Sequence, residues 1–353
     1  MSKAKLILED GTTFEGTSFG ADKSQAGEVV FATGMVGYDL SLTDPSYAGQ
    51  ILTFTYPLIG NWGVPQKEFL ESEKIHVAGL IISDLTENPS HWQSTKTLDS
   101  WLREEDIPGI YGIDTRALTQ KLRGKGVMLG KIINSDQDVE FVDPNTQNLV
   151  AQVSPKELTV HSSQFTVHSS PKIGLLNCGA KKNIIRCLTS RGATVYELPW
   201  NYDPFENDLP IDGLVISNGP GDPKMAKESI AIIKKSMARK IPTFGICLGN
   251  QLLALAAGGD TYKLKFGHRA QNQPTIQVGT KKCYITTQNH GFAVSEKKMP
   301  HGFKRWFINA NDNTNEGIIH EKLPFFSVQF HPEAQPGPKD TEFLFDRFMD
   351  QFK

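Results

Sequence analysis

The alternation of strand and helix patterns after residue 172 is the feature that most limits the folds open to this chain. Buried-strand patterns occur at KIGLLN, ATVYELP, DGLVISNG and IPTFGI. Amphipathic helix patterns lie between them, at KKNIIRCLTSRG and DPKMAKESIAIIKKSMARK. Such β-α alternation predicts a parallel, doubly wound sheet that binds ligands at the carboxyl ends of its strands.

Shorter β-like segments follow, and they predict an added antiparallel portion before the last helix, DTEFLFDRFMDQF. They are TIQV, KCYITTQ, FKRWFINA, EGIIHE and FFSVQF. The first 150 residues are mixed and strand-rich, with a hairpin expected around Asp10-Gly11. In GIDTRALTQKLRGKG (112–126), Asp114 or Thr115 is suited to cap a helix that ends at Gly124. The fold class is therefore α/β, with a strand-rich domain preceding the doubly wound one.

A polar segment separates these two patterns. In VHSSQFTVHSSPK (160–172) the tetrad Val-His-Ser-Ser occurs twice, no core-forming period is present, and a proline comes near the end. We expect domains at 1–150 and 172–353, joined by a linker over 151–171. Its two histidines have no further metal ligands nearby, so no metal site is expected there.

Composition excludes several classes of protein. The 353 residues are 39% hydrophobic and 22% charged, which is typical of a globular protein of two domains. The net charge of −2 argues against a nucleic-acid binder. No apolar run approaches the roughly 18 residues of a membrane span. The charged start of the sequence and the four cysteines without a C-x-x-C pair favour a reduced, cytoplasmic protein without structural zinc or disulfides.

Cys247 lies in Gly-Ile-Cys-Leu-Gly (245–249), where the last strand pattern passes into a helix pattern. This is the context of a nucleophile elbow, in which a sharp strand-to-helix turn exposes an attacking side chain. The helix N-terminus favours the thiolate, and the backbone N–H groups of the turn can face an oxyanion. A buried cysteine that only fills the core explains the same residue type, and the motif alone leaves both interpretations open.

Two further pieces shift the balance toward catalysis. In QFHPE, residues i and i+2 of an extended backbone point the same way, so Glu333 can orient His331 as the acid of a triad does. The loop SNGPGDP (217–223) holds Gly219 and Gly221 and has accessible N–H groups. Taken alone, the His-Pro-Glu segment is common by chance at strand ends, and the glycine loop is common as an ordinary turn. No G-x-x-x-x-G-K-[ST] phosphate loop occurs, so no ATP site of that kind is expected.

These three pieces, in this order and spacing, resemble the class I (triad) glutamine amidotransferase domain over residues 172–353. Within that family, four segments look like the small, glutaminase chain of carbamoyl-phosphate synthetase: FGICLGNQLLALAAGG, KFGHRAQNQP, TTQNHGFAV and QFHPEAQPGP. The first half agrees, because residues 32–63 and GIDTRALTQKLRGKG resemble the N-terminal domain of that chain.

The resemblance implies glutamine hydrolysis through a thioester on Cys247, with His331 as base and Glu333 steering its ring. Backbone N–H groups of Gly219 and Leu248 would form the oxyanion hole. Glutamine would be held by Ser46, Gly219, Gly221, Leu248, Gln251, Asn289, Gly291 and Phe292. No cofactor or metal is implied for this chain. Its partner would be a large chain that receives ammonia and uses bicarbonate and two ATP, for arginine or pyrimidine biosynthesis.

One residue departs from the family pattern. Asn250 stands three residues after the nucleophile, where the family usually has histidine, and altered hydrogen bonding around the site is expected. Two alternatives remain: a free-standing cysteine hydrolase of γ-glutamyl substrates, which leaves residues 1–150 without a purpose, and a non-catalytic scaffold subunit, against which the intact Cys247, His331 and Glu333 argue.

Overall fold

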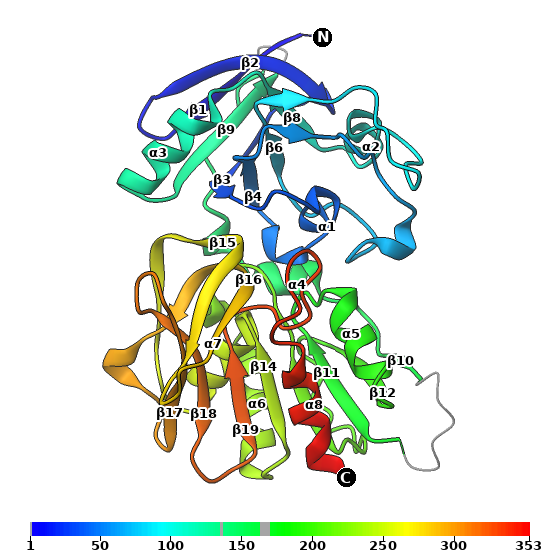
Figure 1. The fold of residues 1–353 in the computed structure, drawn as a ribbon, viewed down its shortest axis with the longest axis vertical. Helices are drawn as coiled ribbons and strands as arrows, with labels where there is room; N and C mark the ends of the chain where they lie inside the picture. Colours follow the sequence, from blue (N-terminus) through cyan, green and yellow to red (C-terminus); the bar gives the residue numbers. More distant parts are fainter. Residues whose placement is uncertain (1, 135–136, 163–169) are drawn as a thin grey trace. The chain divides into compact units, whose positions relative to one another are not determined.

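The computed structural model describes residues 2–134, 137–162 and 170–353. The chain divides into two compact units, Met1–Gln147 and Asn148–Lys353. Both carry their own sheet, and each is described by itself (Figure 1).

The first unit is a closed barrel with the strand order β1-β2-β8-β6-β4-β3-β9. The strands span Lys3–Leu8 (β1), Thr13–Gly20 (β2), Gln25–Ala32 (β3), Gln50–Phe54 (β4), Gly79–Ile81 (β6), Pro108–Tyr111 (β8) and Met128–Asn134 (β9). The shorter β5 (Leu58–Ile59) and β7 (Asp84–Leu85) pair with each other. The helices are α1 (Tyr38–Leu42), α2 (Leu98–Glu104) and α3 (Thr115–Lys125). Parallel and antiparallel pairs both occur, so this unit is mixed and strand-rich as expected.

Local sequence signals explain two of these elements. Gly11 has a φ of 82° in the turn between β1 and β2, a backbone conformation that favours glycine. The side chain of Asp114 accepts a hydrogen bond from the backbone N–H of Ala117 at 2.8 Å and so caps α3. The helix ends at Lys125 rather than at the expected Gly124, with Gly126 as its C-cap.

The second unit is built on a ten-stranded sheet with the order β10-β12-β11-β13-β14-β19-β18-β17-β15-β16. The strands span Thr159–His161 (β10), Lys172–Asn177 (β11), Thr194–Pro199 (β12), Gly213–Ile216 (β13), Thr243–Ile246 (β14), Thr261–Gln277 (β15), Cys283–Val294 (β16), Phe303–Asn309 (β17), Asn315–His320 (β18) and Phe325–Val328 (β19). The helices are α4 (Leu149–Val153), α5 (Lys182–Thr189), α6 (Lys227–Ala238), α7 (Leu248–Ala256) and α8 (Phe343–Met349).

Five neighbouring strands, β12, β11, β13, β14 and β19, are parallel, which confirms the doubly wound prediction. Successive residues of β13 pack into different core clusters. Val215 belongs to the cluster that contains α5 and α8 residues, and Leu214 belongs to the cluster that contains α6 and α7 residues. Because successive side chains of a strand point to opposite faces, the sheet is covered on both sides. No helix in the described parts of the chain combines the length and apolar character that crossing a bilayer requires.

Three details differ from the sequence expectations. The segment expected as linker contributes the end of α4 and the strand β10, which pairs antiparallel with β12 at the edge of the sheet. A three-residue strand is too short to show a period, and half of the residues of the repeated tetrads lie outside the described residues. FFSVQF, grouped with the antiparallel portion, forms β19 and pairs parallel with β14. Finally, β15 begins at Thr261 and includes KLKFGHRAQNQP, where bulges interrupt the alternation.

Candidate active site

Cys247 lies at a sharp turn between β14 and α7. Its φ of 54° and ψ of −102° are unusual for a residue other than glycine, and it is the N-cap residue of α7. Its backbone N–H donates to the carbonyl of Val328 at 2.8 Å, which ties the turn to the end of β19. Strain of this kind persists only where the surrounding structure enforces it, and it is typical of nucleophile elbows.

The two glycines of the motif are required by close packing of the backbone. A Cβ at Gly249 would lie 2.2 Å from the carbonyl oxygen of Ile216, at the end of β13. A Cβ at Gly245 would lie 2.5 Å from the carbonyl oxygen of Gly249. The first turn of α7 therefore backs directly onto the neighbouring strand, and this contact fixes where the Cys247 side chain emerges.

His331 and Glu333 are brought together where the chain leaves β19. Nδ1 of His331 lies 2.6 Å from Oε1 of Glu333, and both side chains are buried. The backbone N–H of His331 donates to Thr287 O of β16 at 2.9 Å, which fixes its backbone. Among the described residues, Nε2 of His331 has no hydrogen-bond partner, so this nitrogen is available to a reacting group.

Glu333 is held from its other side by residues at the start of α5. Nζ of Lys181 lies 3.2 Å from Oε1 of Glu333, and Lys181 is only 2% exposed. The same ammonium group donates to the carbonyl of Ala334, and the side-chain amide of Asn183 donates to the carbonyl of Glu333. A buried carboxylate needs a paired charge, and Lys181 and His331 supply it at Oε1, whereas Oε2 has no hydrogen-bond partner among the described residues.

The electrostatics of this group favour an imidazolium–carboxylate pair. Burial lowers the pKa of His331, but the charges of Glu333 and Cys247 outweigh it and raise this pKa to about 10. Burial raises the pKa of Glu333, but Lys181 and His331 lower it to about 2. His331 is therefore protonated once Cys247 is ionised, and the imidazolium stabilises the negative charge beside it.

The structure places the other predicted site residues as follows. Gly219 and Gly221 follow β13, and a Cβ at Gly219 would lie 2.2 Å from the carbonyl oxygen of Cys178. Leu248 and Gln251 lie on the first turns of α7. Asn289, Gly291 and Phe292 belong to β16. Ser46 lies in the first unit, in a short 3-10 helix, and its contact with glutamine stays a prediction.

Two of these residues have contacts that connect β16 to the elbow. The Cys247 thiol donates to the carbonyl of Asn289 at 3.5 Å. Nε2 of Gln251 donates to the carbonyl of Phe292 at 2.9 Å. The second unit therefore gathers α7, β16 and the segment after β19 around one cysteine, at the carboxyl ends of β14 and β19. This is where ligands bind in doubly wound sheets.

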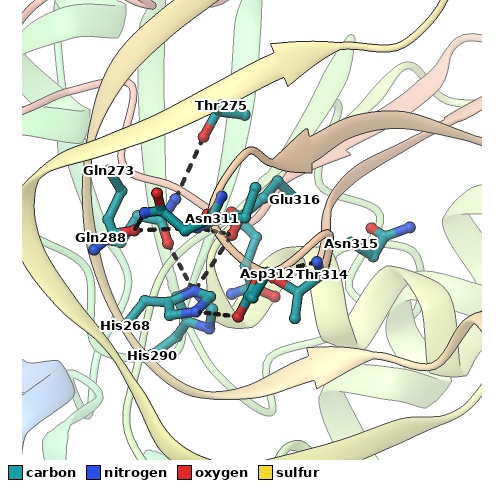
Figure 2. Close-up of polar contacts among 12 residues, drawn as sticks. His268, Gln273, Thr275, Gln288, His290, Asn311, Asp312, Thr314, Asn315 and Glu316 are labelled. Atoms are coloured by element: carbon teal, nitrogen blue, oxygen red, sulfur yellow. Dashed lines mark hydrogen bonds and ion pairs between the residues drawn. The ribbon is translucent and has the colours of Figure 1, made fainter.

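A second buried polar group lies on β15, β16 and β18 (Figure 2). His268, His290 and Glu316 place three potential metal-binding atoms within 4.8 Å of one another. However, Nε2 of His268 lies 2.9 Å from Asp312, and Nδ1 lies 3.4 Å from Glu316. Histidine binds metals through a neutral ring, whereas two flanking carboxylates favour the charged one. The group is therefore better described as a buried ion-pair network than as a metal site.

This network reaches the predicted glutamine-binding strand through His290. Burial and the charge of His268 lower the pKa of His290 well below its ordinary value, so its ring is neutral. Nδ1 of His290 lies 2.8 Å from the carbonyl oxygen of Phe292. Nε2 lies 3.1 Å from Oε1 of Gln288, so both ring nitrogens face an oxygen atom. The ring thus supports the backbone of Phe292 from behind.

Stability is expected to depend on pH through His268. Burial lowers its pKa, but Asp312 and Glu316 outweigh it and raise this pKa to about 9. A raised pKa means that the stabilisation is fully present below the unfolded value of about 6.5 and is lost as pH rises through about 9. His268→Asn should therefore reduce the unfolding free energy more at about pH 6 than at about pH 10, measured by denaturant titration.

The exposed His301 supplies the control for this experiment. His301→Asn should change the unfolding free energy by no more than about 0.5 kcal/mol. If the destabilisation by His268→Asn is the same at both pH values, His268 does not carry the ion pair that the structure gives it.

Sequence reasoning missed three residues close to the predicted catalytic residues: Lys181, Asn183 and Gln329. Lys181 and Asn183 belong to an amphipathic helix pattern, in which a lysine normally faces solvent. The available signal was the run of small residues in NCGAKKN directly after β11, because a turn at a carboxyl strand end brings its side chains toward the site. Gln329 stood within an apolar strand pattern, and a polar residue there was a signal of a buried hydrogen bond.

Comparison with known proteins gives the class first. Residues 174–351 match the family described as glutamine amidotransferase class-I. The chain belongs to this family, as the three motifs around Cys247, His331 and Gly219 indicated. Residues 6–132 match the family described as carbamoyl-phosphate synthase small chain, CPSase domain. The barrel unit therefore contains the domain that this family describes, and the amidotransferase domain follows it along the chain.

Individual relatives agree with both matches. The chain is 49% identical to the multifunctional protein pyr1-3 of Dictyostelium discoideum, over 99% of this chain and 17% of the relative. It is 48% identical to the mitochondrial carbamoyl-phosphate synthase [ammonia] of Rattus norvegicus, over 99% of this chain and 24% of the relative. It is 47% identical to the multifunctional protein URA2 of Saccharomyces cerevisiae, over 99% of this chain and 17% of the relative. The chain thus spans about a fifth of the length of these relatives.

Proposed function

We propose that this chain is the glutaminase part of a glutamine-hydrolysing carbamoyl-phosphate synthase. It hydrolyses L-glutamine to glutamate and delivers the ammonia to a large chain, which makes carbamoyl phosphate from bicarbonate and two ATP. One observation carries the proposal: a strained cysteine at a helix N-terminus lies in the same buried site as a His331–Glu333 pair with a raised imidazole pKa.

The reaction begins with transfer of the Cys247 thiol proton to Nε2 of His331. The thiolate attacks the side-chain amide carbon of glutamine, and the resulting oxyanion accepts hydrogen bonds from the backbone N–H groups of Gly219 and Leu248. His331 then gives its proton to the departing nitrogen, and ammonia leaves a γ-glutamyl thioester. Water attacks this thioester, and His331 takes a proton from the attacking water. Glutamate leaves, and the proton returns to the sulfur.

Glu333 and Lys181 act on this sequence through His331. The carboxylate accepts a hydrogen bond from Nδ1, so the second nitrogen faces the sulfur and the imidazolium is stabilised. Lys181 keeps Glu333 ionised in a buried position. Glutamine binding is assigned to Ser46, Gly219, Gly221, Leu248, Gln251, Asn289, Gly291 and Phe292.

We propose the partner from the family resemblance and the compartment from the charged start of the sequence and its cysteines. A large chain would take up the ammonia through a tunnel and would carry the ATP and metal ions, so that this chain needs no cofactor of its own. We place the chain in the cytoplasm, in arginine or pyrimidine biosynthesis, with no role in nucleic-acid or membrane binding. The small-chain domain at residues 6–132 supports the association with a large chain.

Steady-state assays of the purified chain test this proposal. We expect release of ammonia from L-glutamine, and a higher rate when a carbamoyl-phosphate synthase large chain is added. A strong preference for γ-glutamyl peptides over glutamine would instead indicate a free-standing hydrolase. Absence of any hydrolysis, alone and with the large chain, would indicate a non-catalytic scaffold and would contradict the proposal.

A further inference from the structure

Three buried side-chain amides lie behind Cys247 and are hydrogen-bonded to one another. Asn250 and Gln251 belong to the start of α7, and Gln329 directly follows β19. Oε1 of Gln329 lies 3.1 Å from Nδ2 of Asn250 and 3.2 Å from Nε2 of Gln251. All three residues are at most 3% exposed. We refer to Asn250, Gln251 and Gln329 as the amide cluster.

One backbone carbonyl determines the orientation of every amide in the cluster. The Phe292 carbonyl can only accept, so the Gln251 atom 2.9 Å from it is the NH2 group. The same NH2 group faces Gln329, so the Gln329 atom there is oxygen. Asn250 must then present its own NH2 group to this oxygen, and its Oδ1 accepts from Ser327 Oγ at 2.8 Å. Rotating the Gln329 amide by half a turn would bring NH2 groups face to face.

The consequence is that the Gln329 NH2 group points at the nucleophile. Its Nε2 lies 3.7 Å from Sγ of Cys247. An amide N–H can only donate, so the sulfur is the acceptor in this contact. The carbonyl of Asn289, 3.5 Å from the sulfur, accepts from the thiol and offers nothing to a thiolate. Because a hydrogen bond to a charged acceptor is stronger than one to a neutral acceptor, the Gln329 contact favours the ionised sulfur.

We propose that Gln329 is a further catalytic residue, whose amide stabilises the thiolate of Cys247, and that Asn250 is a positioning residue that keeps this amide in its donating orientation. The proposal rests on the proposed function for the identity of the substrate, but not for the behaviour of the sulfur. It also gives a role to Asn250, which stands where the family usually has histidine. A histidine ring N–H can donate to the same oxygen.

The rate at which iodoacetamide alkylates Cys247, followed across pH by peptide mass spectrometry, tests the proposal, because only the thiolate reacts. Gln329→Met removes the donor without adding charge. We expect alkylation near neutral pH to slow by about 10- to 100-fold, with a midpoint at higher pH, as loss of a hydrogen bond to a charged group implies. Glutamine turnover should lose kcat by a similar factor, with a smaller change in KM.

Variants of Asn250 separate a positioning role from a merely structural one. Asn250→Leu should shift the alkylation midpoint in the same direction by less, since Gln251 still holds Gln329. Asn250→His, unlike Asn250→Leu, should show the same alkylation profile as the wild-type chain. The matched control is Asn134→Leu, which removes a buried amide from β9 in the first unit and should leave the profile unchanged. An unchanged alkylation profile in folded Gln329→Met protein would overturn the proposal.

A measurement on the unmodified chain covers the case in which the Gln329 variant does not fold. The side-chain amide resonances of Gln329 should move with the same pH midpoint as Cys247 alkylation, and resonances that do not follow it would contradict the proposal. The two proposals fail separately. If the chain hydrolyses no glutamine but the Gln329 variant shows the alkylation shift, this inference stands and the proposed function fails. If the chain hydrolyses glutamine but the variant shows no shift, the proposed function stands and this inference fails.

Discussion

Replacing Cys247 with serine is expected to lower glutamine hydrolysis by more than about 10³-fold, since loss of a nucleophile removes the covalent pathway altogether. In the complex with the large chain, synthesis of carbamoyl phosphate from added ammonia should survive, because the ammonia no longer has to be generated on this chain. Ammonia release and carbamoyl phosphate formation, measured side by side, check both halves of this expectation.

Cys283→Ser is the matched control, because Cys283 is exposed at the start of β16 and has no place in the proposed site. It should retain full activity. Loss of both glutamine-dependent and ammonia-dependent synthesis in Cys247→Ser would mean that this cysteine has a structural role. Retention of glutamine hydrolysis would mean that another residue is the nucleophile.

Lys181→Met is expected to have the largest effect on stability. It leaves Glu333 buried with His331 as its only remaining ionic partner among the described residues, and removal of one member of a buried ion pair costs about 3–5 kcal/mol. Burial raises the pKa of Glu333 and Lys181 is the largest influence that lowers it, so this pKa should rise in the variant while Glu333 stays charged at neutral pH. Denaturant unfolding at neutral pH measures the loss of free energy.

Two further variants make this test specific. Lys235→Met breaks a partly exposed ion pair with Asp203, 2.6 Å apart, and a second pair with Glu206, and should cost about 1 kcal/mol. The double variant Lys181→Met with Glu333→Gln should recover part of the stability lost in the single variant, since it removes the uncompensated charge, while activity stays low. A single-variant loss no larger than that of Lys235→Met would show that Lys181 does not stabilise the Glu333 carboxylate.

The sequence predicted those parts of the molecule that depend on local chemistry. Asp114 is a capping residue by its side chain alone, and α3 begins beside it. Gly245 and Gly249 flank Cys247 because the elbow admits no Cβ at either position, so the motif and the turn coincide. The spacing of His331 and Glu333 follows from the geometry of an extended backbone and needs no tertiary information.

The sequence could not predict contacts that the fold brings together from distant segments. The partnership of Lys181 with Glu333 joins residues more than a hundred positions apart, and its lysine is buried against the usual preference of that side chain. The donating orientation of Gln329 depends on a backbone carbonyl of β16. The strand β10 is stabilised by the edge of the sheet rather than by its own three residues.

The central claim is that the sulfur of Cys247 attacks glutamine, and an affinity label tests it most directly. A chloroketone analogue of glutamine places an alkylating carbon where the amide carbon of the substrate would lie. We predict that it modifies Cys247 in one-to-one stoichiometry, that glutamine protects against it, and that the modified chain loses hydrolysis in proportion. Modification of Cys178, Cys187 or Cys283 in place of Cys247, or full activity after Cys247 has been modified, would contradict the account.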